Sequence, residues 1–285
     1  MQMLKEQIFT GERALFHSEN LEIRNCIFED GESPLKESSK IALYQTMFKW
    51  KYPLWYANHV SLEHCTLFNM ARAGMWYTHD ISMRDTVIEA PKGFRRSSEI
   101  RLEHVQFANA EETLWNCKSV VLKDVFARGN YFAMGSESID VENFELVGNY
   151  SFDGCRNVHV RHSKLISKDA FWNCENVVVE DSFISGEYLA WNTKNITFNR
   201  CIIESEQGLC YIDGLVMKDC KLLKTNLAFE YVQGVDADIH SGIDSVKNPI
   251  SGKIKAERIG ELILEPNRID PSQTQIEIAV QDANA

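Results

Sequence analysis

The stretch from Val158 to Lys218 decides the fold, because one pattern of side chains recurs in it every 19 residues. Its four copies read VHVR (158–161), VVVE (177–180), ITFN (196–199) and LVMK (215–218). Each copy alternates its side chains with a period of two and is rich in β-branched residues, which is typical of a short β-strand. A unit of this length predicts one turn of a solenoid that is built from short strands.

The same pattern extends over most of the chain. Further copies start at residues 21, 41, 60, 81, 100, 120 and 139, and a degenerate copy starts at Val235. No repeat carries a sustained apolar stripe with the helical period, which disfavours leucine-rich and helical solenoids. We therefore expect an all-β, single-stranded right-handed parallel β-helix of about twelve coils of ~19 residues. Residues 1–239 should form this β-helix, and residues 240–285 should add capping strands and a tail to the same domain.

Aligned by position, the repeats indicate parallel stacking in register. The residue two positions after each start is always apolar, as in Ile23, Leu62, Leu102, Val141, Val179 and Met217. The residue three positions after the start alternates in charge through Glu63, Arg84, Glu103, Lys123, Glu142, Arg161 and Glu180. Like charges directly above one another would repel, so this alternation favours in-register parallel turns. Each exposed ion pair contributes at most a fraction of a kcal/mol.

The composition excludes several classes of protein. The 285 residues include 44% apolar and 25% charged side chains, the profile of a globular chain, and the net charge is −11. No uncharged apolar run reaches ~18 residues, so we expect no membrane partner. The negative charge argues against nucleic acid. The N-terminus lacks the apolar core of a secretory signal, so we expect a cytoplasmic protein.

The eight cysteines contain no C-x-x-C pair and lack the clustered spacing of metal ligands. In a reducing compartment they should be buried free thiols. We therefore expect no metal site and no cofactor. The succession His64, Asp85, His104 and Asp124 occupies one column, which we interpret as charge complementarity at stacked turns rather than as a metal site.

Three segments carry a resemblance to a known family: residues 149–185, 208–231 and 244–256. Over essentially its whole length the chain resembles the right-handed parallel β-helix proteins of the pectin-lyase-like superfamily. It is most similar to the uncharacterised family called Domain of Unknown Function 3737. The resemblance implies the fold and a cytoplasmic location, and it implies no reaction, because no catalytic residues can be carried over.

One outward column, five positions before each start, contains five of the six tryptophans: Trp55, Trp76, Trp115, Trp172 and Trp191. Arg95 and Asp153 interrupt it. Exposed indoles in a row are costly unless something covers them. Either the column lines a groove in which sugars stack on the indoles, or it packs against a chain terminus or another subunit. For the groove, the candidate ligand-binding residues are Trp76, Tyr77, Arg96, Trp115, Asn116, Trp172, Asn173, Trp191, Asn192 and Tyr211.

The same column supplies the candidates for catalysis. Asp153 is the first choice for a general acid or base and Glu230 the second, while Arg95 could act as an unusual base or bind a substrate carboxylate. Asp153 and Glu230 are about four coils apart, roughly 19 Å. A glycosidase needs its two carboxylates within ~5–9.5 Å, so this pair does not predict one, and whether the protein is an enzyme stays open.

These observations lead to two hypotheses of function. The first is a cytoplasmic β-helix protein that binds a carbohydrate through its aromatic outer face, with processing of that carbohydrate left open. The second is a non-enzymatic scaffold whose tryptophan face is a surface for another protein or for self-association into a homo-oligomer.

Overall fold

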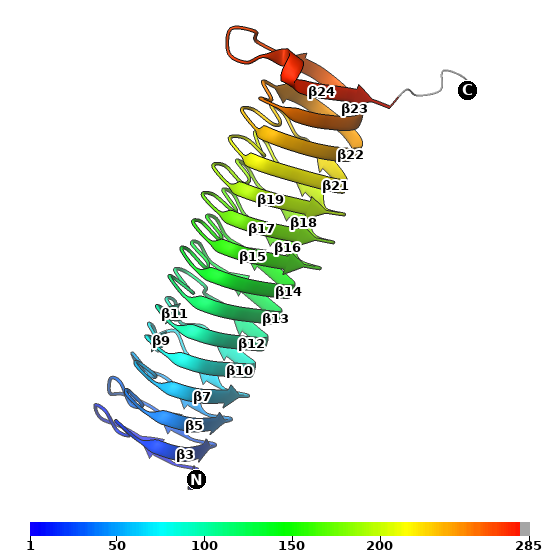
Figure 1. The fold of residues 1–285 in the computed structure, drawn as a ribbon. Helices are drawn as coiled ribbons and strands as arrows, with labels where there is room; N and C mark the ends of the chain where they lie inside the picture. Colours follow the sequence, from blue (N-terminus) through cyan, green and yellow to red (C-terminus); the bar gives the residue numbers. More distant parts are fainter. Residues whose placement is uncertain (280–285) are drawn as a thin grey trace, which may run out of the picture. The chain divides into compact units, whose positions relative to one another are not determined.

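The computed structural model describes residues 1–279, which form two compact units, Met1–Gly148 and the described part of Asn149–Ala285. Each unit is a parallel β-solenoid, which confirms the all-β fold (Figure 1). Among the described residues the one helix is the short 3-10 helix η1, Pro271–Gln273. The tail expected at the end of residues 240–285 lies partly outside this range, from residue 280 onward. No helix in residues 1–279 is long and apolar enough to cross a membrane.

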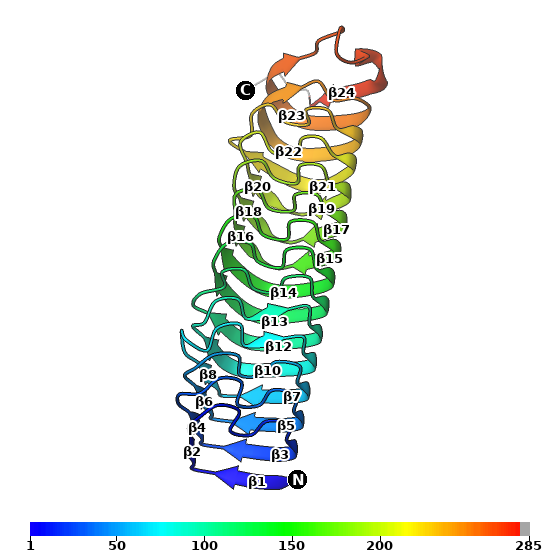
Figure 2. The same ribbon diagram turned by 90° about the vertical axis from the view of Figure 1, so that its left-hand side faces the viewer.

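The first unit contains eight turns, each with one strand of a main sheet. These strands are β1 (Gln2–Lys5), β3 (Glu19–Arg24), β5 (Ser39–Tyr44), β7 (Asn58–Glu63), β10 (His79–Ile88), β12 (Ser98–Phe107), β13 (Lys118–Arg128) and β14 (Glu137–Val147). Short strands follow in the early turns and stack beside the main sheet (Figure 2): β2 (Ile8–Phe9), β4 (Ile27–Phe28), β6 (Met47–Phe48) and β8 (Thr66–Leu67). A two-stranded sheet pairs β9 (Met75–Trp76) with β11 (Phe94–Arg95).

The second unit adds seven turns. Its main strands are β15 (Arg156–Arg161), β17 (Glu175–Glu180), β19 (Lys194–Asn199), β21 (Asp213–Leu223), β22 (Gln233–Lys247), β23 (Gly252–Ile263) and β24 (Thr274–Ile278). Short strands are β16 (Lys164–Ile166), β18 (Phe183–Ser185) and β20 (Ile202–Glu204). Residues 1–279 thus form about 15 turns rather than about twelve. The difference lies at the ends, where β1, β23 and β24 continue the parallel pairing without a clear sequence repeat.

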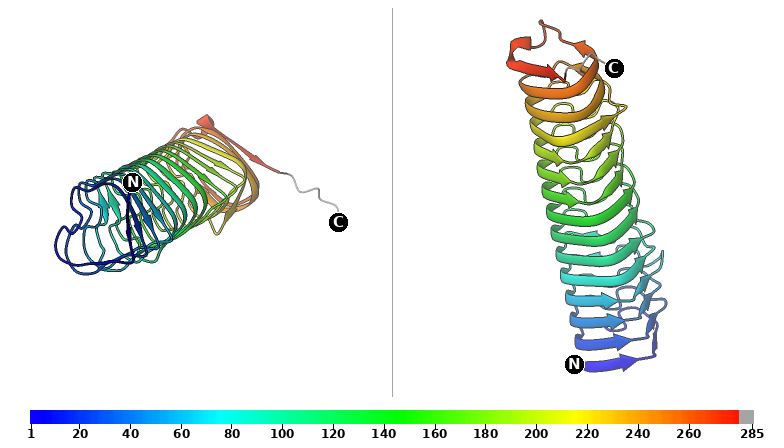
Figure 3. Two further views of the ribbon diagram at one scale, coloured as in Figure 1. Left: turned by 90° about the horizontal axis from the view of Figure 1, so that it is seen from below. Right: turned by 90° about the vertical axis from the view of Figure 1, so that its right-hand side faces the viewer.

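Within each unit the turns pair in the register that the sequence predicts. Leu21 lies opposite Ile41, and Val177 lies opposite Ile196, so equivalent repeat positions are direct neighbours. Figure 3 shows the main strands of each unit one above another. The column two positions after the start is buried throughout, including Ile23, Leu62, Val179 and Phe198, which are 0–1% exposed. This column forms one wall of the core.

The chain turns its corners with residues in the left-handed backbone region. Four positions after each start φ is close to +50°, for example at Asn25, His104 and Asp181. This region costs most residues roughly 1–2 kcal/mol, and Asn and Asp tolerate it best. Ladder hydrogen bonds hold the corners, as when the Asn25 N–H donates to the Tyr44 carbonyl at 3.0 Å.

Candidate functional site: the aromatic columns and the gap at Asp153

The tryptophans of the first unit pack along the stack. The indoles of Trp55 and Trp76 lie parallel, with ring centroids 5.4 Å apart and planes 8° apart. The indole N–H groups donate to carbonyl oxygens of the following turn. Trp76 donates to Lys92 at 2.9 Å, and Trp115, a further member of the column, donates to Tyr131 at 2.6 Å. All three indoles are half-buried. The column is therefore satisfied by the chain itself, with ring edges rather than ring faces available at its surface.

Arg95 replaces an indole in this stack. Its guanidinium carbon lies 4.5 Å from the ring centroid of Trp76 and 4.6 Å from that of Trp115, a cation–π contact on each face. Its Nη2 also lies 3.2 Å from the Glu112 carboxylate. The ring contacts and the ion pair with Glu112 explain why an arginine stands at this position. These contacts give no support to a role of Arg95 as a base.

The remaining predicted residues of the first unit lie at a corner beside the column. Tyr77, Arg96 and Asn116 all have φ between +50° and +59°. Tyr77 stacks on Tyr56, with ring centroids 4.8 Å apart. The structure thus places these predicted residues on neighbouring turns, and packing within the stack accounts for Trp76, Tyr77, Arg95 and Trp115.

The second unit has its own aromatic column. Trp172 and Trp191 are stacked with centroids 5.8 Å apart and planes 8° apart. Their N–H groups donate to the carbonyls of Tyr188 and Gln207, at 2.6 and 2.9 Å. In the next turn Cys210 takes the tryptophan position, and the ring of Tyr211, from the neighbouring column, lies 5.2 Å from Trp191 and is steeply inclined to it. One face of Trp172 is therefore covered by Trp191.

The opposite face of Trp172 is directed at the preceding turn, in which Asp153 occupies the column position of the tryptophans. An aspartate is too small to cover an indole ring. The Asp153 Oδ1 accepts a hydrogen bond from the Asn173 Nδ2 at 2.9 Å, and Asn192 donates in turn to Asn173 at 3.4 Å. Tyr150 approaches Trp172 edge-on, with centroids 6.4 Å apart. The column therefore has a gap at Asp153, beside an indole face.

Asp169 lies next to this gap. Four tryptophans of the column donate their N–H to the carbonyl of the residue 16 positions later in the chain. Asp153 stands at a tryptophan position, and the residue 16 positions after it is Asp169. Asp169 is 2% exposed, and its Oδ1 has no hydrogen-bond partner within residues 1–279. Burial raises the pKa of its carboxyl group; Lys168 opposes this shift, and the Glu187 and Asp153 carboxylates add to it.

We name this cluster the indole gap: Asp153, Asp169, Trp172, Asn173 and Tyr188. The sequence analysis identified Asp153, Trp172 and Asn173 but missed Asp169. A signal was available, because Asp169 interrupts a column of aromatic residues formed by Tyr150 and Tyr188. The indole gap therefore contains a buried carboxyl oxygen that has no hydrogen-bond partner among the described residues.

Glu230, the other predicted acid, lies far from the gap. It is four turns from Asp153, about 19 Å at the spacing of a parallel ladder. Its carboxylate pairs with the Lys247 ammonium at 2.9 Å, and this contact raises the pKa of Lys247. The structure therefore does not bring Glu230 and Asp153 into one site.

The main sheet of the first unit carries a second feature, a shallow hollow of about 540 Å³. Its floor includes the small side chains of Ser61 and Ser82, and charged side chains form its walls. Arg84 pairs with Glu103 at 2.6 Å, and this contact lowers the pKa of the Glu103 carboxyl group. Carboxylates held ionised in this way are poor general acids.

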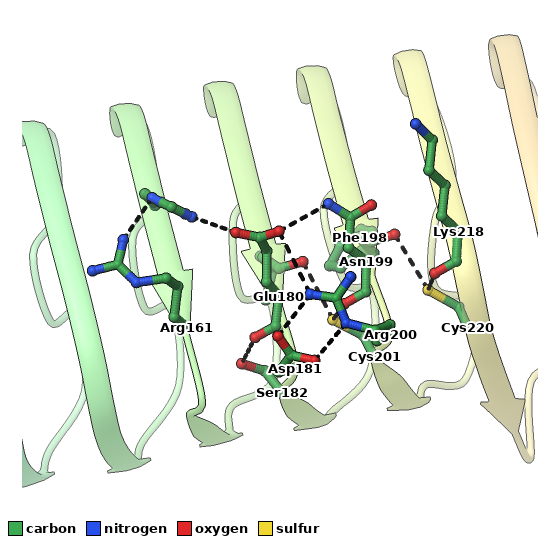
Figure 4. Close-up of polar contacts among 12 residues, drawn as sticks. Arg161, Glu180, Asp181, Ser182, Phe198, Asn199, Arg200, Cys201, Lys218 and Cys220 are labelled. Atoms are coloured by element: carbon green, nitrogen blue, oxygen red, sulfur yellow. Dashed lines mark hydrogen bonds and ion pairs between the residues drawn. The ribbon is translucent and has the colours of Figure 1, made fainter.

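Charged side chains of neighbouring turns pair along the stack in two columns. One is the predicted alternating column, where Arg84 and Lys123 both pair with Glu103, and the other lies one position later. In the second unit Arg200 donates two hydrogen bonds to Asp181, at 2.7 and 2.8 Å, while Asn199 donates to Glu180 at 3.1 Å (Figure 4). Arg200 lowers the pKa of Asp181. In the first unit His104 lies between two aspartates, 3.3 Å from Asp85 and 3.4 Å from Asp124. Stacking of turns accounts for these residues.

One group in the described residues has donor atoms close enough for a metal ion: Asp219, Asp238 and His240, within 4.8 Å of one another. Lys255 already pairs with Asp238 at 3.1 Å, and His240 lies 3.1 Å from the same carboxylate. An exposed ion-pair network accounts for this cluster. The eight cysteines are free and buried, as expected, and Figure 4 shows the thiols of Cys201 and Cys220 directed at backbone carbonyls.

Comparison with known proteins yields one family and several distant likenesses in fold. The model of the family described as "Protein of unknown function (DUF3737)" matches residues 2–277. Curated proteins yield no match. The Azotobacter vinelandii mannuronan C-5 epimerase AlgE4 A-module is 9% identical, with a TM-score of 0.32, covering 97% of this chain and 88% of that one.

Two other solved structures are similarly distant. QnrB1, a plasmid-mediated fluoroquinolone resistance protein, is 13% identical with a TM-score of 0.26, covering 78% of this chain and 92% of that one. The catalytic domain of a GH87 α-1,3-glucanase in complex with nigerose is 10% identical with a TM-score of 0.29, covering 98% and 63%. Likenesses at this level carry no argument about function.

Proposed function

We propose a function from the geometry alone, because the chain belongs to the DUF3737 family, whose function is unknown. The proposal is that the protein binds a carbohydrate at the indole gap of its second unit. A single observation carries it: one face of Trp172 is stacked on Trp191, and the other lies beside Asp153 and the buried Asp169. The sequence-based expectations of a cytoplasmic protein that binds neither nucleic acid nor membrane are kept with this proposal.

The face of Trp172 that Trp191 does not stack on would supply the apolar part of such a site, beside the edge of the Tyr150 ring. Pyranose rings have one face rich in C–H groups, and a largely apolar surface with a few converging polar groups is the general description of a ligand site. An aromatic ring also provides a flat, rigid contact of large area. The partly covered Trp172 provides this contact, whereas Trp76 has the indole of Trp55 on one face and Arg95 on the other.

The polar groups around the gap suit hydroxyl groups. The Asp153 carboxylate accepts hydrogen bonds, and Asn173 both accepts and donates. A sugar, whose hydroxyl groups both donate and accept, matches this mixture better than an anion does.

Binding without bond cleavage fits the carboxyl groups best. A general acid has to reach within hydrogen-bond distance of the leaving oxygen, and Asp169 is 2% exposed. Glu230, the other predicted acid, is four turns away and paired with Lys247. The scaffold hypothesis, in which the tryptophan face contacts another protein, is supported less well, because most indole faces already stack on neighbouring turns.

The test is isothermal titration calorimetry against a panel of neutral and acidic oligosaccharides. At least one member should bind, and Trp172→Ala and Asp153→Asn should each weaken binding at least tenfold. Ring stacking on an aromatic side chain contributes about 1–3 kcal/mol in nucleic-acid complexes, and a hydrogen bond to a charged group contributes about 1.5–3 kcal/mol. Trp76→Ala is the matched control, because it removes an indole whose faces are covered, and it should bind normally. Circular dichroism checks that all variants keep their strands. Absence of binding to every oligosaccharide, or equal losses in Trp76→Ala and Trp172→Ala, would contradict the proposal.

A further inference from the structure

The first turn of the first unit has one side without a ladder partner. Strand β1 pairs with β3, with Leu4 opposite Ile23 and Lys5 opposite Arg24. Within the first unit no other strand pairs with β1 among the described residues, and Figure 2 shows β1 at the end of its stack. An exposed strand edge offers unpaired N–H and C=O groups to another strand.

The direction of these backbone groups follows from the later turns. The carbonyl of Arg24 accepts from the Glu6 N–H, and the carbonyl of Tyr44 accepts from the Asn25 N–H, both at 3.0 Å. In this column each carbonyl therefore points toward the preceding turn. Lys5 occupies the same column in the first turn, so its carbonyl points toward the open side. Backbone groups alternate in direction along a strand, so those of Met3 point the same way.

The side chains of the first turn are also incompletely covered. Leu4 stands in the column whose other members are buried, yet it is half-exposed. Phe9 is likewise half-exposed, whereas Phe28 and Phe48, which follow it in the same column, are 3% and 0% exposed. A partner that pairs with β1 would cover apolar side chains as well as satisfy backbone groups.

We infer that a second copy of this chain docks here, with the two β1 strands antiparallel about a two-fold axis at Leu4. This register sets Leu4 opposite Leu4 of the second copy and Met3 opposite Lys5 of the second copy. Met3 and Lys5, whose backbone groups point toward the open side, then form hydrogen-bonded pairs with Lys5 and Met3 of the second copy. A two-fold contact uses the same patch on both copies and closes at a dimer.

The charges of the first turn favour a second copy as the occupant. Residues 1–18 contain Lys5 and Arg13 against Glu6 and Glu12, so their formal charge balances, whereas the whole chain carries −11. Two such turns can therefore approach without the repulsion expected between two acidic chains. The register also places no like charges directly opposite each other.

Sedimentation velocity over a wide range of protein concentration tests the inference. The wild type should sediment as a dimer that dissociates on dilution. Met3→Pro should be monomeric, because proline removes the N–H that pairs the two copies while the fold makes no use of that group. Met3→Lys should also be monomeric, because it sets two lysines opposite each other.

Val121→Lys is the matched control. It replaces an apolar side chain that is 46% exposed on the face of β13, away from the strand edge, and it should remain a dimer. Circular dichroism should show the same strand content in all four proteins. A wild type that stays monomeric at every concentration, Met3 variants that dimerise like the wild type, or open-ended assembly would each overturn the inference.

Discussion

Replacing Asp169 with asparagine should stabilise the protein. The carboxyl group is 2% exposed, and its Oδ1 lacks a hydrogen-bond partner within the described residues. Leaving a buried polar group unsatisfied costs about 1–3 kcal/mol, and more when the group is charged. Asparagine has nearly the same shape and no charge to desolvate. We therefore expect Asp169→Asn to raise the free energy of unfolding by about 1–2 kcal/mol at neutral pH.

The effect should depend on pH in a defined direction. Burial raises the pKa of Asp169 above the ordinary value of 3.8, so the folded state binds this proton more tightly than the unfolded state does. Stability therefore falls as pH rises from the unfolded pKa through the folded one. The advantage of Asp169→Asn should be largest at neutral pH and should shrink as the pH falls toward 4.

Urea unfolding, followed by tryptophan fluorescence at several pH values, measures this difference. Asp153→Asn is the control, because Asp153 is half-buried and already accepts a hydrogen bond from Asn173. It should change the free energy of unfolding by less than about 0.5 kcal/mol. A destabilised Asp169→Asn at neutral pH, or an advantage that grows as the pH falls, would refute the account of this carboxyl group.

Three further predictions follow from the packing. Arg95→Met should lower the free energy of unfolding by about 1–2 kcal/mol, because two cation–π contacts are lost, and an unchanged urea midpoint would contradict the stacked role of this residue. Phe48→Ala should cost about 3–5 kcal/mol, since Phe48 is fully buried, and thermal denaturation would show a loss under 1 kcal/mol if its ring were not in the core. The thiols should react with a disulfide reagent only in urea, because burial raises the pKa of Cys117 and of Cys210 to about 12; fast reaction of the folded protein would show that they are accessible.

The sequence predicts the repeat but not its ends. Leu21, Val60 and Val177 occupy equivalent positions because an apolar residue is needed wherever a turn contributes to the core. At the ends of the solenoid an apolar residue is less strictly needed at this position. Gly252 stands opposite the start position of Val235, and β24 pairs beyond it, so these turns carry no readable repeat. Terminal repeats of a solenoid have one neighbour rather than two, and their sequences are less constrained.

The tryptophan column shows a different limit. The sequence places Trp172 and Trp191 in one register, which the structure confirms, because side chains 19 residues apart lie one above another. Their ring orientation depends on the N–H donors finding carbonyls in the following turn, which spacing alone does not reveal. Burial of Asp169 at a corner depends likewise on neighbours from adjacent turns. The column and its interruption at Asp153 could therefore be predicted, whereas the covered indole faces and the buried Asp169 depend on contacts between turns.

Distances between spin labels within the first unit test the in-register stack most directly. Cysteines introduced at Glu19 and Lys118, both exposed and in one column, lie five turns apart along the paired strands. The ladder spacing predicts about 24 Å between their backbones, and about 5 Å more when Glu137 replaces Lys118 as the second site. Pulsed electron–electron resonance should show this increment per turn. A separation that does not increase by one ladder spacing would contradict the stacking of turns.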